Sequence, residues 1–387
     1  LARLGLDVTI IEAAPQIAPS LDEDVACEAA SYLRSRGVKI FTSAAVEDIG
    51  ALGADVVILS VGIRPESELA ARAGLKLTDR GLILTDEAMR TSDPDIYAAG
   101  DAVAVRHAVS GALTHIPLAG PANKQARVAA DNICGIPSRY KGALGTSVLK
   151  LFDMTVAATG LTERALKGTG IPYDKVFLWS TSHAGYYPGA ANMSLKVLFN
   201  TETGRLLGAQ IAGFDGVDKR IDVLATAIRA GLTAYDLTEL DLAYAPPFSS
   251  AKDPVNMAGY VMENVLTGKV RQHHWHDVEE LERRDDICLL DVRTEEEFAR
   301  GHFKNALNIP LHTLRDHLEE LRGRGPIYVS CQSGLRSYIA ARILTQNGFE
   351  CSNLAGGYRL YAAVRQNAGF DGELTAPCGV KIRRKDA

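Results

Sequence analysis

Cys331 is the residue whose sequence context points most directly to chemistry. It ends the β-rich run IYVSC (327–331) and precedes a short loop with Gly334 and a helical pattern from about Arg336. In such a strand–loop–helix, the loop N–H groups and the helix N-terminus converge on the sulfur, which lowers the pKa of a thiol and stabilises a persulfide anion. Arg336 adds positive charge at the end of the loop. The pattern predicts a sulfur-carrying nucleophile at Cys331, and the alternative is a buried strand-end thiol.

A glycine and an acid form the second candidate site. Gly100 and Asp101 follow the β-rich run DIYAA (95–99). The glycine allows the backbone to come close to a ligand, and the aspartate can accept a hydrogen bond from a hydroxyl of a sugar-like chain. The alternative is an ordinary turn with an acid that caps a helix. We expect a ligand rich in hydroxyl groups at this position.

Glu12 is the third candidate, at the end of the short strand pattern DVTII (7–11). A carboxylate there in a dinucleotide-binding fold accepts hydrogen bonds from the adenosine ribose and repels a 2′-phosphate. This favours NADH over NADPH, and the alternative is a solvated acid. The glycine-rich phosphate loop of such a unit would lie upstream of Leu1, so we expect residues 1–72 to be the remainder of a nucleotide-binding domain.

The elements that must position these residues follow an α/β pattern. Strand and helix patterns alternate in residues 1–72, with DVVILSVG (55–62) expected as a buried parallel strand. Residues 146–270 mix strand and helix patterns, and residues 287–366 form a second α/β module. The remaining segments are expected as follows: 73–145 as the C-terminal part of a cofactor domain, 271–286 as a linker and 367–387 as a polar tail.

Composition excludes several classes of function. The net charge of −5 over 387 residues gives no reason to expect nucleic acid, and no apolar run is long enough to span a membrane. The 6 cysteines show no paired spacing, which indicates reduced thiols in a cytoplasm. We expect no metal: there is no CxxC, and HHWH (273–276) is interpreted as a solvated stretch of the linker.

The segment TSDPDIYAAGDAVAV (91–105) resembles the second flavin-binding motif of the FAD-dependent pyridine nucleotide-disulfide oxidoreductases. The matching residues are Thr91, Asp93, Ile96, Ala98, Gly100 and Asp101. The resemblance implies that Asp101 holds the ribityl chain of FAD. It extends to SVGIRPE (60–66), which contains Gly62, and to a helix lying against the flavin that begins at Pro117, Leu118 and Ala119.

The segment around YAPPFS (244–249) resembles the dimerisation domain of one branch of this superfamily, the coenzyme A-disulfide reductases and their NADH oxidase and peroxidase relatives. The resemblance implies a homodimer through residues 146–270. It also implies two tyrosines that line the disulfide site: Tyr244 and either Tyr186 or Tyr187, with Tyr186 slightly favoured. A phenol there can give a proton to a departing sulfur. The alternative is that these are interface aromatics.

The C-terminal module resembles the rhodanese family. LLDVRTEEEFARGHFKNALNIPL (289–311), which includes Asp291 and Arg293, and LAGGYRLY (354–361) carry this resemblance beside the Cys331 loop. It implies that Cys331 is the residue that carries sulfane sulfur.

Together these resemblances imply an incomplete flavoprotein reductase fold with two dinucleotide-binding domains, an α+β dimerisation domain and an α/β rhodanese domain. The implied cofactors are FAD and NADH (or NADPH), with coenzyme A as substrate. The implied reaction reduces coenzyme A disulfide, coenzyme A persulfide or polysulfide and transfers sulfur through Cys331.

The redox cysteine of this branch and the other half of the FAD-binding domain, of which residues 73–145 are the C-terminal part, would lie upstream of Leu1. We therefore expect this chain to lack the disulfide-reducing thiolate and to retain FAD poorly. Three alternatives remain: a sulfurtransferase only, a flavoprotein similar to NADH oxidase or peroxidase, and a non-catalytic sulfur-binding dimer.

Overall fold

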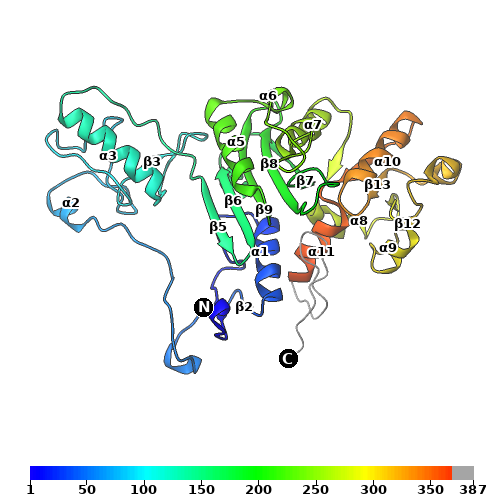
Figure 1. The fold of residues 1–387 in the computed structure, drawn as a ribbon, viewed down its shortest axis with the longest axis horizontal. Helices are drawn as coiled ribbons and strands as arrows, with labels where there is room; N and C mark the ends of the chain where they lie inside the picture. Colours follow the sequence, from blue (N-terminus) through cyan, green and yellow to red (C-terminus); the bar gives the residue numbers. More distant parts are fainter. Residues whose placement is uncertain (368–387) are drawn as a thin grey trace. The chain divides into compact units, whose positions relative to one another are not determined.

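The computed structural model describes residues 1–367, which form two compact units (Figure 1). One unit contains residues 1–45, 148–158 and the chain from 162 onward, and the other contains 46–147 and 159–161. No helix in the described part of the chain is both long and apolar enough to cross a membrane.

The first unit begins with a small βαβ fragment. After the short 3-10 helix η1 (Ala2–Leu4), strand β1 (Thr9–Ile11) pairs in parallel with β2 (Lys39–Phe41), and α1 (Glu23–Ser35) connects them. The acids in the first turn of α1 and its apolar stripe explain why this segment is helical. The strand predicted at 7–11 is therefore confirmed over residues 9–11.

A five-stranded sheet in the order β5-β6-β9-β8-β7 forms the α+β domain. Its strands are β5 (Ser147–Leu151), β6 (Met154–Gly160), β7 (Tyr173–Thr181), β8 (Asn192–Asn200) and β9 (Leu206–Gly213). Its helices are α4 (Glu163–Leu166), α5 (Val217–Ala230), α6 (Ala234–Glu239) and α7 (Pro254–Leu266). Helix α5 packs on β9, and α7 packs against β7 and β8.

Buried charges tie α1 to this sheet. Lys196 on β8 is 1% exposed and bonds both carboxylate oxygens of Asp24 at 2.8 Å. It also forms ion pairs with Asp22 and Glu163. Because three carboxylates surround one ammonium group, each ion has a partner despite its burial. The pKa of Glu163 is held at about 2 by Lys196 and Lys175, against the opposing effect of burial.

Glu28 on α1 lacks such a cation at hydrogen-bonding distance. The Ser194 hydroxyl donates to its Oε2 at 3.0 Å, and its Oε1 has no partner among the described residues. Burial raises the pKa of Glu28 from its ordinary value of 4.5 to about 8. The carboxyl is therefore mostly protonated at neutral pH.

We expect Glu28→Gln to gain stability relative to the wild type as pH rises. The folded-state pKa lies above the unfolded one, so the contribution of the protonated carboxyl is present below pH 4.5 and is lost as pH rises through about 8. The variant has no such loss, so the difference should grow by roughly 2–4 kcal/mol between about pH 5 and pH 8. Urea denaturation at several pH values measures it, with exposed Glu23→Gln on the same helix as control. A constant difference would contradict the assignment.

A parallel sheet in the order β10-β14-β13-β11-β12 forms the C-terminal module. Its strands are β10 (Gln272–His273), β11 (Cys288–Asp291), β12 (Leu307–Asn308), β13 (Ile327–Ser330) and β14 (Cys351–Leu354). Its helices are η3 (Trp275–Asp277), α8 (Val278–Leu281), α9 (Glu295–Ala299), η4 (Leu314–His317), η5 (Glu319–Leu321), α10 (Leu335–Gln346) and α11 (Gly357–Asn367). Helix α10 packs on β13 and β14.

Residues 271–286, which we expected to be a linker, begin with a strand of this sheet. His273 on β10 is 7% exposed, and the ring of His274 bonds Asp174 at 3.0 Å. The prediction that HHWH is a solvated stretch is therefore wrong for these two residues, because β10 pairs with β14 and draws His273 into the interior.

The second unit contains η2 (Gly50–Leu52), α2 (Glu68–Arg72), β3 (Val105–Arg106), β4 (Leu113–Thr114) and α3 (Ala119–Ile133). A small core joins Met89 and Val103 to α3. The buried strand predicted at 55–62 is wrong: this segment forms no strand, and Val61 is 91% exposed. An all-apolar strand is buried only when other strands and helices cover it, and no pairing among the described strands includes this segment.

Candidate functional site

Cys331 follows the last residue of β13 and starts the loop that leads into α10. Its side chain is buried, and two donors contact Sγ: the Gly334 backbone N–H at 3.2 Å and the Ser337 hydroxyl at 3.2 Å. Gly334 has a φ of 97°, a left-handed conformation that favours glycine at this turn. The predicted strand–loop–helix geometry around this sulfur is therefore present.

The Ser337 hydroxyl has two acceptors within reach. Its Oγ lies 3.2 Å from Cys331 Sγ and also 3.2 Å from the Gly334 carbonyl oxygen. One hydroxyl donates only one proton, so it can bond the carbonyl while the sulfur is protonated and turn to the sulfur when it becomes an anion. The sequence reasoning did not single out Ser337, although its place in the first turn of α10 is a usable signal.

Replacing Ser337 with alanine should slow the reaction of Cys331 with iodoacetamide about tenfold at neutral pH, because a hydrogen bond to a charged group contributes about 1.5–3 kcal/mol. The pH profile of alkylation should shift to higher pH. Peptide mapping after timed alkylation measures the rate. Ser330→Ala is the matched control, because the Ser330 hydroxyl bonds the Leu290 carbonyl instead. Equal profiles in both variants would contradict the role of Ser337.

Arg336 is paired with a carboxylate. Its Nη1 and Nη2 donate to the two oxygens of Glu297 at 2.7 Å each, and these bonds hold the pKa of Glu297 at about 2. The positive charge expected from Arg336 at the end of the loop is therefore balanced by Glu297. The pair ties α9 to the first turn of α10, and Glu297 is a contributor that we had not assigned.

A buried ion pair supports the loop from β11. Arg293 and Asp291 are 2% and 0% exposed and bond through several atoms, with Arg293 Nη2 at 2.6 Å from Asp291 Oδ2. Nη1 of Arg293 donates to Gln332 Oε1 at 3.3 Å, and its guanidinium lies 4.2 Å from the centre of the Tyr358 ring. Gln332, the residue after Cys331, is thus held by the Arg293 guanidinium, which Asp291 fixes in place.

The two tyrosine-bearing loops meet in the α+β domain. The phenol oxygens of Tyr186 and Tyr244 are 3.3 Å apart, and this hydrogen bond raises the pKa of Tyr244. Tyr187 points elsewhere, with its ring 5.8 Å from the ring of His183. The geometry therefore favours Tyr186 as the partner of Tyr244.

Arg220 clamps these two loops together. This α5 residue is 1% exposed, and its Nη2 donates to the Ser182 carbonyl at 2.8 Å, the Ser249 hydroxyl at 3.2 Å and Asp253 Oδ2 at 3.0 Å. The Ala184 N–H adds a bond to the Ser249 carbonyl. The sequence reasoning did not identify Arg220, because its partners are far away in the chain.

Gly100 and Asp101 form an open turn in the second unit. Gly100 has a φ of 95°, and a Cβ placed on it would meet nothing within 4 Å. Its N–H donates to Gln125 Oε1 at 2.8 Å, whereas Gln125 Nε2 is buried and has no partner in the described part of the chain. With the exposed Asp101 carboxylate, these groups fit the hydroxyls and polar edges of FAD.

The other predicted cofactor residues lie on irregular backbone or at element ends. Leu118 is the N-cap of α3, with Pro117 before it and Ala119 as the first helical residue. Gly62 has a φ of 100° in an irregular segment. Glu12 follows β1, and its Oε1 accepts a hydrogen bond from the Ala14 N–H at 2.8 Å.

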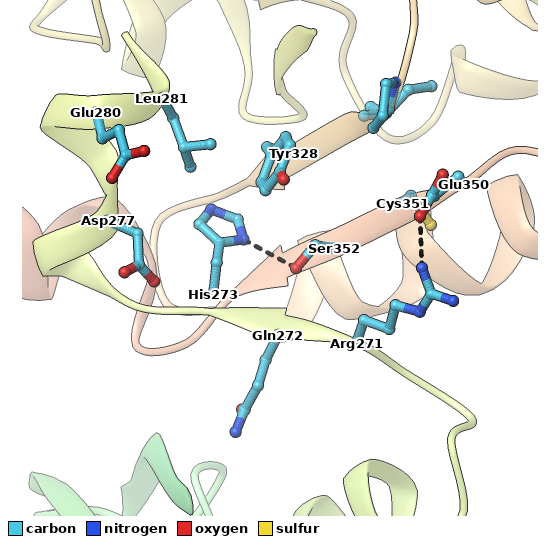
Figure 2. A pocket seen from close by; sticks show the side chains of 12 residues that line it. Arg271, Gln272, His273, Asp277, Glu280, Leu281, Tyr328, Glu350, Cys351 and Ser352 are labelled. Atoms are coloured by element: carbon cyan, nitrogen blue, oxygen red, sulfur yellow. Dashed lines mark hydrogen bonds and ion pairs between the residues drawn. The ribbon is translucent and has the colours of Figure 1, made fainter. Parts of the chain in front are cut away.

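A cavity of about 340 Å³ lies at the other end of the C-terminal sheet (Figure 2). It is lined by the first residues of β13 and β14, whereas Cys331 follows the last residue of β13. Figure 2 shows His273 bonded to Ser352 and Arg271 paired with Glu350. Burial lowers the pKa of His273 to about 3, so its ring is neutral. This cavity does not contain the residues predicted to do chemistry.

Comparison with known proteins assigns three segments of the chain to family models. Residues 1–126 match the pyridine nucleotide-disulphide oxidoreductase model, 146–254 match its dimerisation domain, and 275–363 match a rhodanese-like domain. The solved structure of reduced Bacillus anthracis CoADR-RHD is 46% identical, with a TM-score of 0.90 over 93% of this chain and 67% of that one. The chain belongs to the pyridine nucleotide-disulfide oxidoreductases.

Other relatives of this chain have related names. A NAD-dependent persulfide reductase from A. fulgidus is 40% identical, with a TM-score of 0.84 over 93% of this chain and 68% of that one. A coenzyme A disulfide reductase of Staphylococcus haemolyticus is 37% identical over 66% of this chain and 60% of its own length. A Pyrococcus horikoshii NAD(P)H coenzyme A polysulfide/persulfide reductase is 40% identical over 56% of this chain and 49% of its own length. The chain spans about half to three fifths of these two curated relatives.

Proposed function

We propose that this oxidoreductase carries sulfane sulfur on Cys331 and takes part in NADH-dependent reduction of coenzyme A persulfide, polysulfide or coenzyme A disulfide. The observation that carries the proposal is the pair of donors on Cys331 Sγ, from Gly334 and Ser337. The rhodanese-like match and the similarity to two persulfide reductases support the substrate class.

The transfer step uses the Cys331 thiolate as the nucleophile. It attacks the outer sulfur of a donor such as thiosulfate, the donor's S–S bond breaks, and sulfite leaves with the electron pair. The persulfide anion on Cys331 is then stabilised by the two donors of the loop. A coenzyme A thiolate attacks the terminal sulfur, which forms coenzyme A persulfide and restores the cysteine thiolate.

The reduction step needs a hydride and a proton for each persulfide. NADH and one proton convert the coenzyme A persulfide anion to coenzyme A thiol and hydrosulfide, with NAD⁺ as the other product. FAD, when bound by Gly100, Asp101 and the start of α3, would pass the two electrons from NADH to sulfur. The hydrogen-bonded Tyr186 and Tyr244 are suited to give a proton to the departing sulfur. Glu12 would bind the nucleotide ribose.

We further propose a cytoplasmic homodimer that pairs through residues 146–270. The match of residues 146–254 to a dimerisation domain supports the pairing, and the buried cysteines Cys288, Cys331 and Cys351, which form no disulfide, support a reducing compartment. Small thiols and persulfides are the partners, and neither nucleic acid nor membrane is expected. A sulfurtransferase-only role is the second candidate, because the hydrogen-bonded Cys331 loop is formed without the cofactor segments.

Sulfur loading tests the proposal directly. Protein incubated with thiosulfate, alkylated and digested should show one added sulfur atom on the peptide that contains Cys331, and cyanide should remove it as thiocyanate. Added sulfur on the Cys288 or Cys351 peptides instead would contradict the assignment. For the reductase step, FAD, NADH and coenzyme A persulfide are supplied, and NADH oxidation is compared with sulfide release. Sulfur loading without NADH oxidation would favour the second candidate.

A further inference from the structure

The turn behind the sulfur loop contacts the α+β domain as well as its own module. Gly356 and Gly357 join β14 to α11, and both are buried. A Cβ on Gly357 would lie 2.6 Å from the Cys331 carbonyl oxygen, and a Cβ on Gly356 would lie 2.9 Å from a ring carbon of Phe177 on β7. The turn is therefore packed between the sulfur loop on one side and β7 on the other.

Helix α11 receives the carbonyls of the sulfur loop at its N-terminus. The Tyr358 N–H donates to the Cys331 carbonyl at 2.8 Å, and the Arg359 N–H donates to the Gln332 carbonyl at 3.1 Å. These are first-turn N–H groups, which have no partner within their own helix. In a trans peptide the C=O and the following N–H point in opposite directions. Holding these two carbonyls toward α11 therefore turns the N–H groups of Gln332 and Ser333 away from it.

Trp179 on β7 holds the start of α11 in place. Its indole N–H donates to the Gly356 carbonyl at 3.0 Å, across 177 residues of sequence. The guanidinium of Arg359 lies 3.9 Å from the centre of the Trp179 ring. One side chain of the α+β domain thus contacts both the turn and the residue whose N–H bonds the loop.

A hydrophobic core shared by α11, β7 and α1 stabilises the contact between α11 and the α+β domain. Leu360 and Val364 of α11 belong to one buried cluster with Phe177 of β7 and with residues of α1, and α11 lies beside α1 (Figure 1). Tyr358 and Tyr361 of α11 pack against Phe303 in its own module, so the position of α11 is set jointly by that module and by surfaces outside it.

We propose that Trp179 is a positioning residue for sulfur transfer, through which β7 of the α+β domain orients the peptide groups of the Cys331 loop. This inference rests on the proposed function of Cys331. The sulfur-binding site is then completed by the α+β domain, and small movements of β7 change how well the loop stabilises a sulfur anion.

Trp179→Phe in the full chain is the test. It keeps an aromatic ring under Arg359 and removes the indole N–H. We expect alkylation of Cys331 at neutral pH to slow about three- to tenfold and its pH profile to shift to higher pH, since one hydrogen bond contributes about 0.5–1.5 kcal/mol. In sulfur transfer from thiosulfate to cyanide, kcat should fall more than KM rises. Tyr173→Phe on the same strand is the control, since it removes a polar hydrogen away from the turn.

Two results would overturn the inference. One is an alkylation profile of Trp179→Phe that matches the wild type, and the other is the same shift in Tyr173→Phe. Alkylation does not require sulfur transfer, so the proposed function is tested separately. If the wild type does not transfer sulfur while the alkylation profile still depends on Trp179, the proposed function fails and the positioning of the loop is supported.

Discussion

Cys331→Ser should abolish transfer of sulfur from thiosulfate to cyanide, with a loss of at least ~10³-fold. The reaction needs a thiolate at the end of β13, and a serine hydroxyl at the same place neither ionises readily nor holds a second sulfur. The serine can still meet the Gly334 N–H and the Ser337 hydroxyl, so the fold should be retained.

Cys351→Ser is the matched control for this variant. Cys351 is also buried on the same sheet, but its Sγ contacts the Ala341 carbonyl and the Thr345 hydroxyl on the α10 side. We expect its transfer rate to stay within about threefold of the wild type, because it takes no part in the chemistry. Thiocyanate formation measures both rates. Retained activity in Cys331→Ser, or equal loss in Cys351→Ser, would remove the assigned nucleophile.

Arg220→Met should lower the free energy of unfolding by about 3–5 kcal/mol, the usual cost of breaking a buried ion pair from one side. Asp253 would keep its buried charge without the arginine, and the carbonyl of Ser182 would lose a donor. Because the clamp joins the two tyrosine-bearing loops, the bond between Tyr186 and Tyr244 should also be lost.

Chemical denaturation of the single and double variants separates these effects. Asp253→Asn keeps the oxygen that accepts from the Val255 N–H at the start of α7 and removes the buried charge. The double variant Arg220→Met/Asp253→Asn should therefore recover part of the loss seen in Arg220→Met. A loss below about 1 kcal/mol in the single variant would show that the clamp is not needed for stability.

Local patterns predicted most of the regular elements. The β-rich run at 327–331 and the helical pattern from about Arg336 correspond to β13 and α10, because each pattern continues over a full element. The run at 55–62 has an equally clear apolar pattern and forms no strand, because strand formation depends on neighbours that a local pattern does not contain.

The candidate site residues also divide into those that a local sequence pattern identifies and those that only the fold brings together. Cys331, Gly334 and the Gly100–Asp101 turn could be found from sequence, because a strand end, a glycine and a following helix are neighbours in the chain. Ser337 lies only 6 residues from Cys331, and its contact follows from the first turn of α10. The contact between Tyr186 and Tyr244 depended instead on loops that are 58 residues apart.

The sequence by itself determined the family and selected Cys331 as the proposed sulfur-carrying residue, because both depend on residue types at short spacing. Only the tertiary structure decided which acidic residue pairs with Arg336 and which groups outside the Cys331 loop hold that loop in place. Glu297 meets Arg336 across 39 residues, and Trp179 meets Gly356 across 177. Buried polar groups in a folded chain need hydrogen-bond partners. The partner of such a group is a residue that lies close to it in space, and that residue can be far away in the sequence.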